Sequence, residues 1–591
     1  MLNSFVNTIL GSYLAGLIIL LLLLSLSITL RQNEFNQVAG AQNLEATYHV
    51  LLTIKALKEN PISNHWYLPT ITLGGDRNKG IPWGATVPRK SGDYIYTSFT
   101  PPGFLVPYLV FSTFDAQTSI RNLARFNFAV GAIVSILLFT LLWRVLIFTG
   151  LSPSLSLGGA LVGCAIGIFS REALQSHGIV YWSQSLYQLP LIASLWFVFK
   201  YLSVDDNLPK KRRIYAYAIV IATFLGALTE WTGYIFNLGL VFLFWFGVQR
   251  VGSSKTLAIG ILIITATAGV CTLIHYGLAL GYTQALEAFL GRFLARNAST
   301  GSISGLIKGY GLSFGLFLIL FVVLAISHTV TRREATPGDK PPHPSSLRQL
   351  PQHWETYVSR YSRFLHTADR KHIVLYFLFV AACIPLLENV LLLQHAEQFS
   401  FDRLKFIFPA ALIFAFSFYR QSNTLRCFLG AAILLASFQG FVSYKNNLNK
   451  YEKWAKIDAA NQNLSMKISD NIDTSCAVYL SNIQVRGYAN LLFNRGIYEA
   501  KLLNDSIELI NLRNSCAAVY LEGHLAFPDL PEYTKAVVTY PDGTAVELRV
   551  QNGEKQIEMD MTALTILLLV LVALGFLSLK LWKNFTFPQR C

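Results

Sequence analysis

The chain has 591 residues, of which 53% are hydrophobic and 14% are charged, and its mean hydropathy is +0.43. These values exclude an ordinary soluble protein and indicate a polytopic α-helical membrane protein. The net charge of +15 does not indicate nucleic-acid binding, because lysine and arginine gather in short segments between apolar stretches, as in the cytoplasmic loops of membrane proteins.

About twelve apolar stretches are candidate membrane spans, on the rule that about 20 apolar residues cross the hydrocarbon. The first, residues 7–30, is longer than a signal-peptide core, and no small-residue cleavage site follows it. We expect it to be retained, the alternative being a cleaved signal. The others are residues 126–148, 155–170, 179–202, 214–229, 234–248, 257–280, 312–326, 373–393, 406–419, 427–442 and 564–582.

Alternation of these spans agrees with the charge pattern. With a cytoplasmic N-terminus, the cation-rich segments 210–213, 250–255, 332–371 and 583–590 all fall in the cytoplasm, as the positive-inside rule requires. Both termini are then cytoplasmic. The segments that fall on the outer face are 31–121, 281–308, 395–403 and 444–561.

This topology predicts three regions. Residues 1–443 form a transmembrane domain, in which 31–121 is a large outer loop and 331–372 a basic cytoplasmic loop. Residues 444–561 form a small outer α/β domain, and residues 562–591 hold the last span and a cytoplasmic tail.

The outer loop opens directly after the first span with Arg31-Gln32-Asn33-Glu34. Apolar residues at helical spacing predict an interfacial helix over residues 36–57, and residues 104–114 form a second amphipathic segment, too short to span, that we expect along the membrane surface. Glu34 lies where polar chemistry and lipid meet, so it is our candidate for the reacting base. The alternative is that it only ends the first span in water.

The outer domain has two similar strand starts, at residues 475–480 and 515–521, with a helix predicted between them over residues 490–503. This order indicates a small α/β unit with parallel neighbouring strands, and the sequence at 540–543 predicts a hairpin turn. Cys476 and Cys516 begin equivalent strands on an oxidising face, so we expect a disulfide between them. The alternative is two buried thiols, because matching strand starts do not prove disulfide geometry.

The order of these features resembles the GT-C glycosyltransferases over residues 1–403. These enzymes have an acidic residue just after the first span, as in Asn33-Glu34, then a helix on the membrane surface and a Pro-Pro motif, as in residues 96–104. The polar break at 229–234 and the outer segment 287–293, with its acid and arginine, are similar as well. The layout is nearest to the bacterial aminoarabinose and related lipid-sugar transferases, and similar to the protein O-mannosyltransferases.

The chain departs from that pattern at three places. Asn33 stands where many members have aspartate, and Thr100 stands where the lipid-sugar transferases have lysine. The acidic residue often found after the third span is absent from residues 177–183. The donor and any need for a divalent metal ion therefore stay open, and no metal ligand or other cofactor is assigned.

The resemblance implies transfer of a sugar from a polyprenyl-phosphate donor to a lipid, glycan or protein acceptor on the periplasmic face of a bacterial inner membrane. A carboxylate takes the proton of the attacking hydroxyl, a role that fits Glu34, and cations stabilise the leaving phosphate. The candidate phosphate ligands are Arg403, Lys405, Arg292 and Arg296. The candidates for other substrate contacts are Asn33, Thr100, Glu230 and Trp83.

Each assignment has a structural alternative. Arg403 and Lys405 would otherwise extend toward lipid headgroups, and Arg292 and Arg296 would bind anionic lipid. Acids within or near apolar runs, Glu230 and Glu388, would pair with neighbouring helices. His177 and His395 have no partner at ligand spacing, which favours structural roles. Trp83 and nearby aromatic residues fit an interfacial belt as well as a sugar platform.

Two other functions remain open from the sequence. A transporter or flippase of lipid-linked sugars would show internal repeats, and no repeat relates the two halves. A surface-polysaccharide polymerase or ligase would use the same kind of donor but transfer a whole glycan.

Overall fold

The computed structural model of the chain describes residues 2–36, 44–73, 85–89, 91–205, 207–247, 254–297, 301–334, 370–420 and 422–449. It also describes the short segments 477–480, 490–491, 497–499, 517–520, 534–539 and 545–550. The predicted last span at 564–582, and Cys476 and Cys516 with their predicted disulfide, lie outside these residues.

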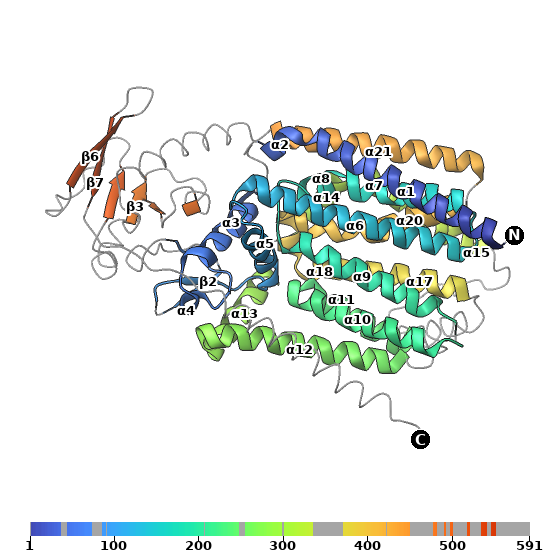
Figure 1. Ribbon diagram of the computed structural model, residues 1–591, viewed down its shortest axis with the longest axis horizontal. Coiled ribbons are helices and arrows are strands. Elements are labelled where there is room, and N and C mark those ends of the chain that lie inside the picture. The colour runs from blue at the N-terminus through green and yellow to red at the C-terminus, as the bar shows by residue number, and fades with distance from the viewer. Residues whose placement is uncertain are drawn as a thin grey trace, which may run out of the picture.

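Long helices run alongside one another and form a bundle (Figure 1). They are α1 (Leu2–Leu30), α6 (Ile120–Thr149), α7 (Pro153–Phe169), α9 (Ser183–Ser203), α10 (Pro209–Thr229), α11 (Thr232–Phe242), α12 (Ser254–Leu280), α14 (Ile303–Phe314), α15 (Leu316–Glu334), α17 (Arg370–Cys383), α20 (Ile407–Arg420) and α21 (Asn423–Asn449).

Every predicted span before residue 443 coincides with helix in this bundle. Among the described residues, 6 helices are long and apolar enough to cross a membrane by length and composition, or up to 7 if the bent pair α14 and α15 is one span. The chain is therefore a multi-helix membrane protein. The other helices are shorter or less apolar, so the count of twelve spans stays a prediction.

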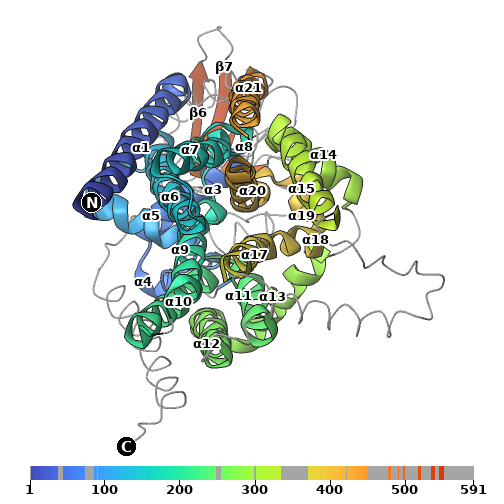
Figure 2. The same ribbon diagram turned by 90° about the vertical axis from the view of Figure 1, so that its right-hand side faces the viewer.

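Small residues let the central helices approach closely. A Cβ on Gly163 of α7 would lie 2.8 Å from the carbonyl oxygen of Ala411 in α20, and close backbone approach of this kind stabilises helix pairs in membranes. Viewed along the bundle, α1 and α21 lie at its edge (Figure 2), and only 17% and 22% of their apolar windows are buried. Their exposed leucine, isoleucine and phenylalanine side chains fit contact with lipid.

One end of the bundle, which we call the head end, carries α2 (Gln32–Asn36), α3 (Leu44–Glu59), α4 (Ile62–His65), α5 (Pro102–Thr113) and α13 (Tyr282–Asn297), opposite the N-terminus (Figure 1). A short antiparallel pair, β1 (Thr86–Pro88) and β2 (Tyr94–Tyr96), lies here as well.

The two helices predicted along the membrane surface are instead largely buried in protein. In α3, Leu51 and Ile54 are fully buried, and Thr47 Oγ1 donates to the carbonyl of Ile179 at 2.9 Å. In α5, Gly103 packs on α9, where a Cβ would lie 2.6 Å from Cβ of Ser183. The apolar faces of both helices pack against other parts of the chain, and residues 37–43 of the first predicted helix lie outside the described residues.

The part of the chain that follows α21 contains a five-stranded sheet beyond the head end (Figure 1). Its order is β4 (Ile497–Glu499), β3 (Ala477–Leu480), β5 (Ala517–Tyr520), β7 (Ala545–Val550) and β6 (Thr534–Thr539). The predicted parallel pairing is confirmed, because Ala477 of β3 is in register with Ala517 of β5, and β6 and β7 form the predicted antiparallel hairpin. The predicted helix over 490–503 is wrong at 497–499, which form β4 beside β3.

A break at Gly315 separates α14 from α15 and bends the pair by 109°. Gly315 has φ 52° and ψ −123°, a backbone conformation that non-glycine residues rarely adopt. The side chain of Gln439 fills the space of the missing Cβ, and its Oε1 accepts a hydrogen bond from the Leu316 amide at 3.2 Å. The bend therefore depends on glycine for both its backbone conformation and its packing.

We expect Gly315→Ala to destabilise the folded protein, because the new Cβ would be 2.1 Å from Gln439 Oε1 and the backbone would be strained by about 1–3 kcal/mol. Thermal unfolding of the purified protein should show a lower Tm. Gly311→Ala is the matched control in α14, since nothing lies within 4 Å of its Cβ position. Equal Tm values for the two variants would contradict this account of the bend.

Candidate active site

Buried polar and charged side chains from seven helices, together with Glu230 directly after α10, lie near the head end. Each is between 0% and 9% exposed. Because an unpaired charge in apolar surroundings is costly, the partners of each one matter. We call this set the polar belt; its members are Glu34, Glu172, Gln184, Glu230, Arg296, Glu388, His395, Asp402, Arg403 and Lys405.

Glu388 and Lys405 form a buried ion pair. Glu388 lies in α18 (Leu387–Leu391), and Lys405 lies in the 3-10 helix η4 (Ser400–Phe406). Thr232 of α11 donates to the Glu388 carboxylate, and Lys405 Nζ lies 3.4 Å from Thr232 Oγ1. The charge of Lys405 is therefore already balanced by a protein carboxylate.

His395 and Asp402 form a second buried pair. His395 lies in α19 (Leu393–Gln398), and its Nδ1 contacts a carboxylate oxygen of Asp402 in η4. Gln184 Nε2 of α9 donates to the other oxygen at 2.7 Å. Burial acts to raise the pKa of Asp402, but its contact with His395, together with smaller contributions from Lys405 and Arg296, outweighs burial and lowers that pKa below its usual value. Asp402 is therefore ionised at neutral pH.

Arg403 and Glu172 are joined through a serine. Arg403 Nε donates to Ser313 Oγ at 2.9 Å, and that hydroxyl donates to Glu172 Oε2 at 2.8 Å. Arg403 also donates to the carbonyls of Ala396 at 2.5 Å and Glu397 at 3.2 Å, so it holds the end of α19. Like Lys405, it does not extend outward but is buried among protein partners.

Glu172, in α8 (Arg171–Ser176), is an acid that our sequence analysis missed. Residues 177–183, where the family pattern predicts a carboxylate after the third span, contain none, whereas Glu172 lies directly after the predicted span 155–170. Its other oxygen accepts from Ser176 Oγ at 2.5 Å. The signal in the sequence was an acid in the first turn of a helix with a serine before it, since Ser170 caps α8.

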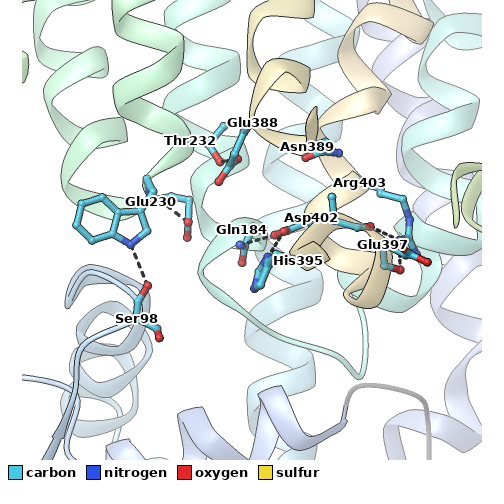
Figure 3. A network of polar contacts seen from close by, with 12 residues as sticks. Ser98, Gln184, Glu230, Thr232, Glu388, Asn389, His395, Glu397, Asp402 and Arg403 are labelled. Carbon is cyan, nitrogen blue, oxygen red and sulfur yellow. Dashed lines mark hydrogen bonds and ion pairs between the residues drawn. The ribbon is translucent and has the colours of Figure 1, made fainter. Parts of the chain in front are cut away.

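Glu230 ends α10 and lies close to Asp402 and Glu388 (Figure 3). Ser183 donates to its carboxylate, and the amide of Trp231 donates to Oε1 at 3.2 Å. Burial, with a smaller contribution from Glu388, raises the pKa of Glu230 to about 8. Glu230 is therefore largely protonated at neutral pH. As a result, at most two of the three neighbouring acids, Glu230, Glu388 and Asp402, carry a negative charge.

Arg292 and Arg296 approach the same place from α13. Arg292 Nε donates to Ser98 Oγ at 2.7 Å, and the guanidinium carbon of Arg296 lies 4.6 Å from the centre of the Phe99 ring. Neither arginine forms an ion pair with a carboxylate of the described residues. The opposite side of α13 exposes large apolar side chains, namely Leu286, Leu290, Phe293 and Leu294.

Glu34, the predicted base, lies in a separate part of the belt. It pairs with Lys445 of α21, and its Oε2 is buried without a hydrogen-bond partner in the described structure. Arg31 fixes this region, because its guanidinium donates to the carbonyls of Leu174 at 2.8 Å and His177 at 3.0 Å. No hydrogen bond or ion pair of the described residues joins Glu34 to a predicted phosphate ligand.

The other residues predicted to contact the substrate differ in their burial. Thr100 is fully buried and its hydroxyl has no partner among the described residues, whereas the side chain of Asn33 is exposed. Trp83 lies outside the described residues. His395, for which the sequence offers no partner at ligand spacing, contacts Asp402 seven residues later, because the fold brings the two together.

No family model and no curated protein sequence matches this chain. The structure of ArnT from Cupriavidus metallidurans bound to undecaprenyl phosphate aligns with 91% of this chain and 98% of its own, at 10% identity and a TM-score of 0.50. The apo state of that protein covers the same shares, at 12% identity and a TM-score of 0.38. The Archaeoglobus fulgidus oligosaccharyltransferase tethered with an acceptor peptide aligns with 93% of this chain and 75% of its own, at 12% identity and a TM-score of 0.41.

The first of these likenesses shows that the chain has a GT-C-like membrane fold. The resemblance drawn from the order of sequence features is thereby confirmed at the level of the fold.

We expect Lys405→Met to destabilise the protein strongly, because it leaves Glu388 buried without its cation, a change that typically costs about 3–5 kcal/mol. The double variant Lys405→Met/Glu388→Gln should recover much of the lost Tm, since no unpaired charge remains. Lys308→Met, at an exposed position of α14, is the control. A double variant that unfolds at the lower Tm expected from adding both single losses would show that the two residues do not act as a pair.

Proposed function

We propose that this chain is an integral membrane glycosyltransferase that transfers a sugar from a polyprenyl-phosphate-linked donor to an acceptor at the outer, periplasmic face of a bacterial inner membrane. The observation that carries the proposal is the pair Arg292 and Arg296, two arginines without a carboxylate partner among the described residues, next to the polar belt. The GT-C-like fold supports it, since the ArnT structure that shares this fold contains undecaprenyl phosphate.

The position of these arginines fits a lipid phosphate. Guanidinium groups bind phosphate through paired, charge-assisted hydrogen bonds. A helix with exposed apolar residues on one face and cations on the other lies at the membrane boundary, and α13 has both. A phosphate held by Arg292 and Arg296 would therefore sit at the head end while its prenyl chain stayed in lipid.

Lys405 and Arg403 contribute to this site in another way. Lys405 is neutralised by Glu388 and Arg403 is held by Ser313 and two carbonyls. We propose that Arg403 acts on the donor phosphate as a fixed positive charge and that Lys405 contributes less, because Glu388 balances its charge, whereas the two arginines of α13 make the direct contacts.

The base we propose is Glu34. Its Oε2 is buried with no partner in the described structure, so a hydroxyl or amine of the acceptor would satisfy it. In the transfer step the acceptor atom forms a bond to the anomeric carbon as the bond from that carbon to the phosphate oxygen breaks. The proton of the acceptor goes to Glu34, and the polyprenyl phosphate leaves with the electron pair.

The acceptor and the metal requirement are proposed only in general terms. A lipid, a glycan or a protein segment would each supply the nucleophile. No group of three or more potential metal ligands occurs among the described residues. The steps above state only what the side chains of this protein do.

Glu34→Gln should abolish the release of polyprenyl phosphate, with a loss of roughly 100- to 10,000-fold if the residue acts as the base. Folding should be retained, since glutamine still accepts from Lys445. The assay detects polyprenyl phosphate released in membranes supplied with acceptor, and release also excludes a flippase, which moves its lipid without cleaving it. Glu287→Gln, at an exposed acid of α13, should remain active. Full turnover by Glu34→Gln would show that Glu34 is not the base.

Arg296→Gln and Arg292→Gln should raise the KM for the lipid donor by roughly 10- to 100-fold, because each removes a charge-assisted hydrogen bond of about 1.5–3 kcal/mol. Donor titration with a fixed acceptor concentration gives this KM. Arg125→Gln, an exposed arginine of α6, controls for general loss of positive charge. A KM that is unchanged in both α13 variants would place the donor phosphate elsewhere.

A further inference from the structure

The His395–Asp402 pair leaves one imidazole nitrogen available. Nδ1 of His395 contacts Asp402, and since an ionised carboxylate only accepts, Nδ1 carries the hydrogen of that bond. In the neutral ring the lone pair is then on Nε2. That atom has no hydrogen-bond partner among the described residues, although the residue is only 8% exposed. Gln184 holds the other oxygen of Asp402, so the orientation of the pair is fixed from two sides.

His395 lies near Arg296, one of the two arginines proposed to bind the donor. Its ring is 5.9 Å from the ring of Phe99, and Arg296 contacts the same Phe99 ring at 4.6 Å. The charged groups that face it are Asp402 of η4, Arg296 of α13 and Glu388 of α18. Burial lowers the pKa of His395; Asp402 acts to raise it and Arg296 to lower it further, with a net lowering. The imidazole is therefore neutral at neutral pH when no anion is present.

We propose that His395 is a further ligand of the donor phosphate that takes up a proton when the donor binds, and that Asp402 is its positioning residue. This inference rests on the proposed function, because it assumes a phosphate at Arg296. A phosphodiester there places one negative charge beside the ring, and a nearby anion favours the protonated form of histidine. The proton comes from solvent to Nε2, which then donates to a phosphate oxygen, while Asp402 stabilises the imidazolium.

The same proton serves the transfer step. When the bond between the anomeric carbon and the phosphate oxygen breaks, the phosphate gains a second negative charge. A charge-assisted hydrogen bond from Nε2 strengthens as that charge develops, which is how fixed donors favour a transition state. The proton of the acceptor still goes to Glu34, so the two groups have separate roles.

Proton uptake predicts that donor affinity depends on pH. The pKa of His395 is higher in the complex than in the free protein. Affinity therefore rises as the pH falls below the pKa of the complex, by at most about tenfold per pH unit, and levels off below the pKa of the free protein. Above the higher pKa, where neither state binds the proton, affinity is constant.

The test measures binding of farnesyl methyl phosphate to the purified full-length protein between about pH 5 and pH 8, where histidine charge changes are expected. This phosphodiester keeps a single negative charge over that range, so any change in affinity comes from the protein. The wild type should bind more tightly as the pH falls. His395→Gln should bind as the wild type does at the highest pH but without the rise, and Asp402→Asn should show a smaller rise.

Two controls make the result decisive. His372→Gln, an exposed histidine at the start of α17, should keep the wild-type pH dependence, and farnesol, which lacks the phosphate, should show none. The inference is overturned if His395→Gln retains the wild-type pH dependence while remaining folded, or if farnesol shows the same dependence. If the wild type does not bind farnesyl methyl phosphate at any pH, the proposed function itself fails.

Discussion

The cost of burying charge determines how the head end is built. Ten polar or charged side chains are at most 9% exposed there, and in apolar surroundings each is tolerated only when it is paired or hydrogen-bonded. Glu388 has Lys405, Asp402 has His395 and Gln184, and Arg403 has a serine and two carbonyls. Polar atoms without a partner within the described structure are informative for the same reason. Among them, Glu34 Oε2, Arg296 Nε and the Thr100 hydroxyl have no hydrogen-bond partner.

Helix ends explain why these side chains meet at one level. Helices α2, α8, α10, α18 and α19 begin or end near the belt, and their unsatisfied carbonyls and amides need partners. Arg31 supplies them at the end of α8, and Arg403 does so at the end of α19. The charged side chains therefore have two effects. They form hydrogen bonds with the carbonyls at the ends of helices near the head end, and they create a polar layer in a bundle that is otherwise apolar. This layer lies beside α13, which carries Arg292 and Arg296 on one side and exposed apolar side chains on the other.

Much of the architecture could be predicted from the sequence, because apolar runs and helical periodicity are local. All spans expected before residue 443 coincide with helix, and the parallel pairing of β3 with β5 followed from two similar strand starts. The errors came from tertiary context. Periodicity over residues 36–57 and 104–114 identified the apolar faces of α3 and α5 but not what covers them, and β4 pairs with a strand that the local pattern of 490–503 does not reveal.

The candidate site was less predictable, since its partners are distant in the chain. Glu34 meets Lys445, and Gln184 meets Asp402, pairs for which no spacing rule exists. Glu172 and the His395–Asp402 pair were missed, although Glu172 opens a capped helix and the other two stand in a short polar segment between apolar helices.

The most direct test of the account is photo-crosslinking of the intact protein with a prenyl phosphodiester that carries a diazirine next to the phosphate, followed by peptide mapping. The account predicts crosslinks to α13 and to the segment from α19 to η4, and competition by undecaprenyl phosphate. Crosslinks confined to the exposed apolar side chains of α1 and α21 would contradict it.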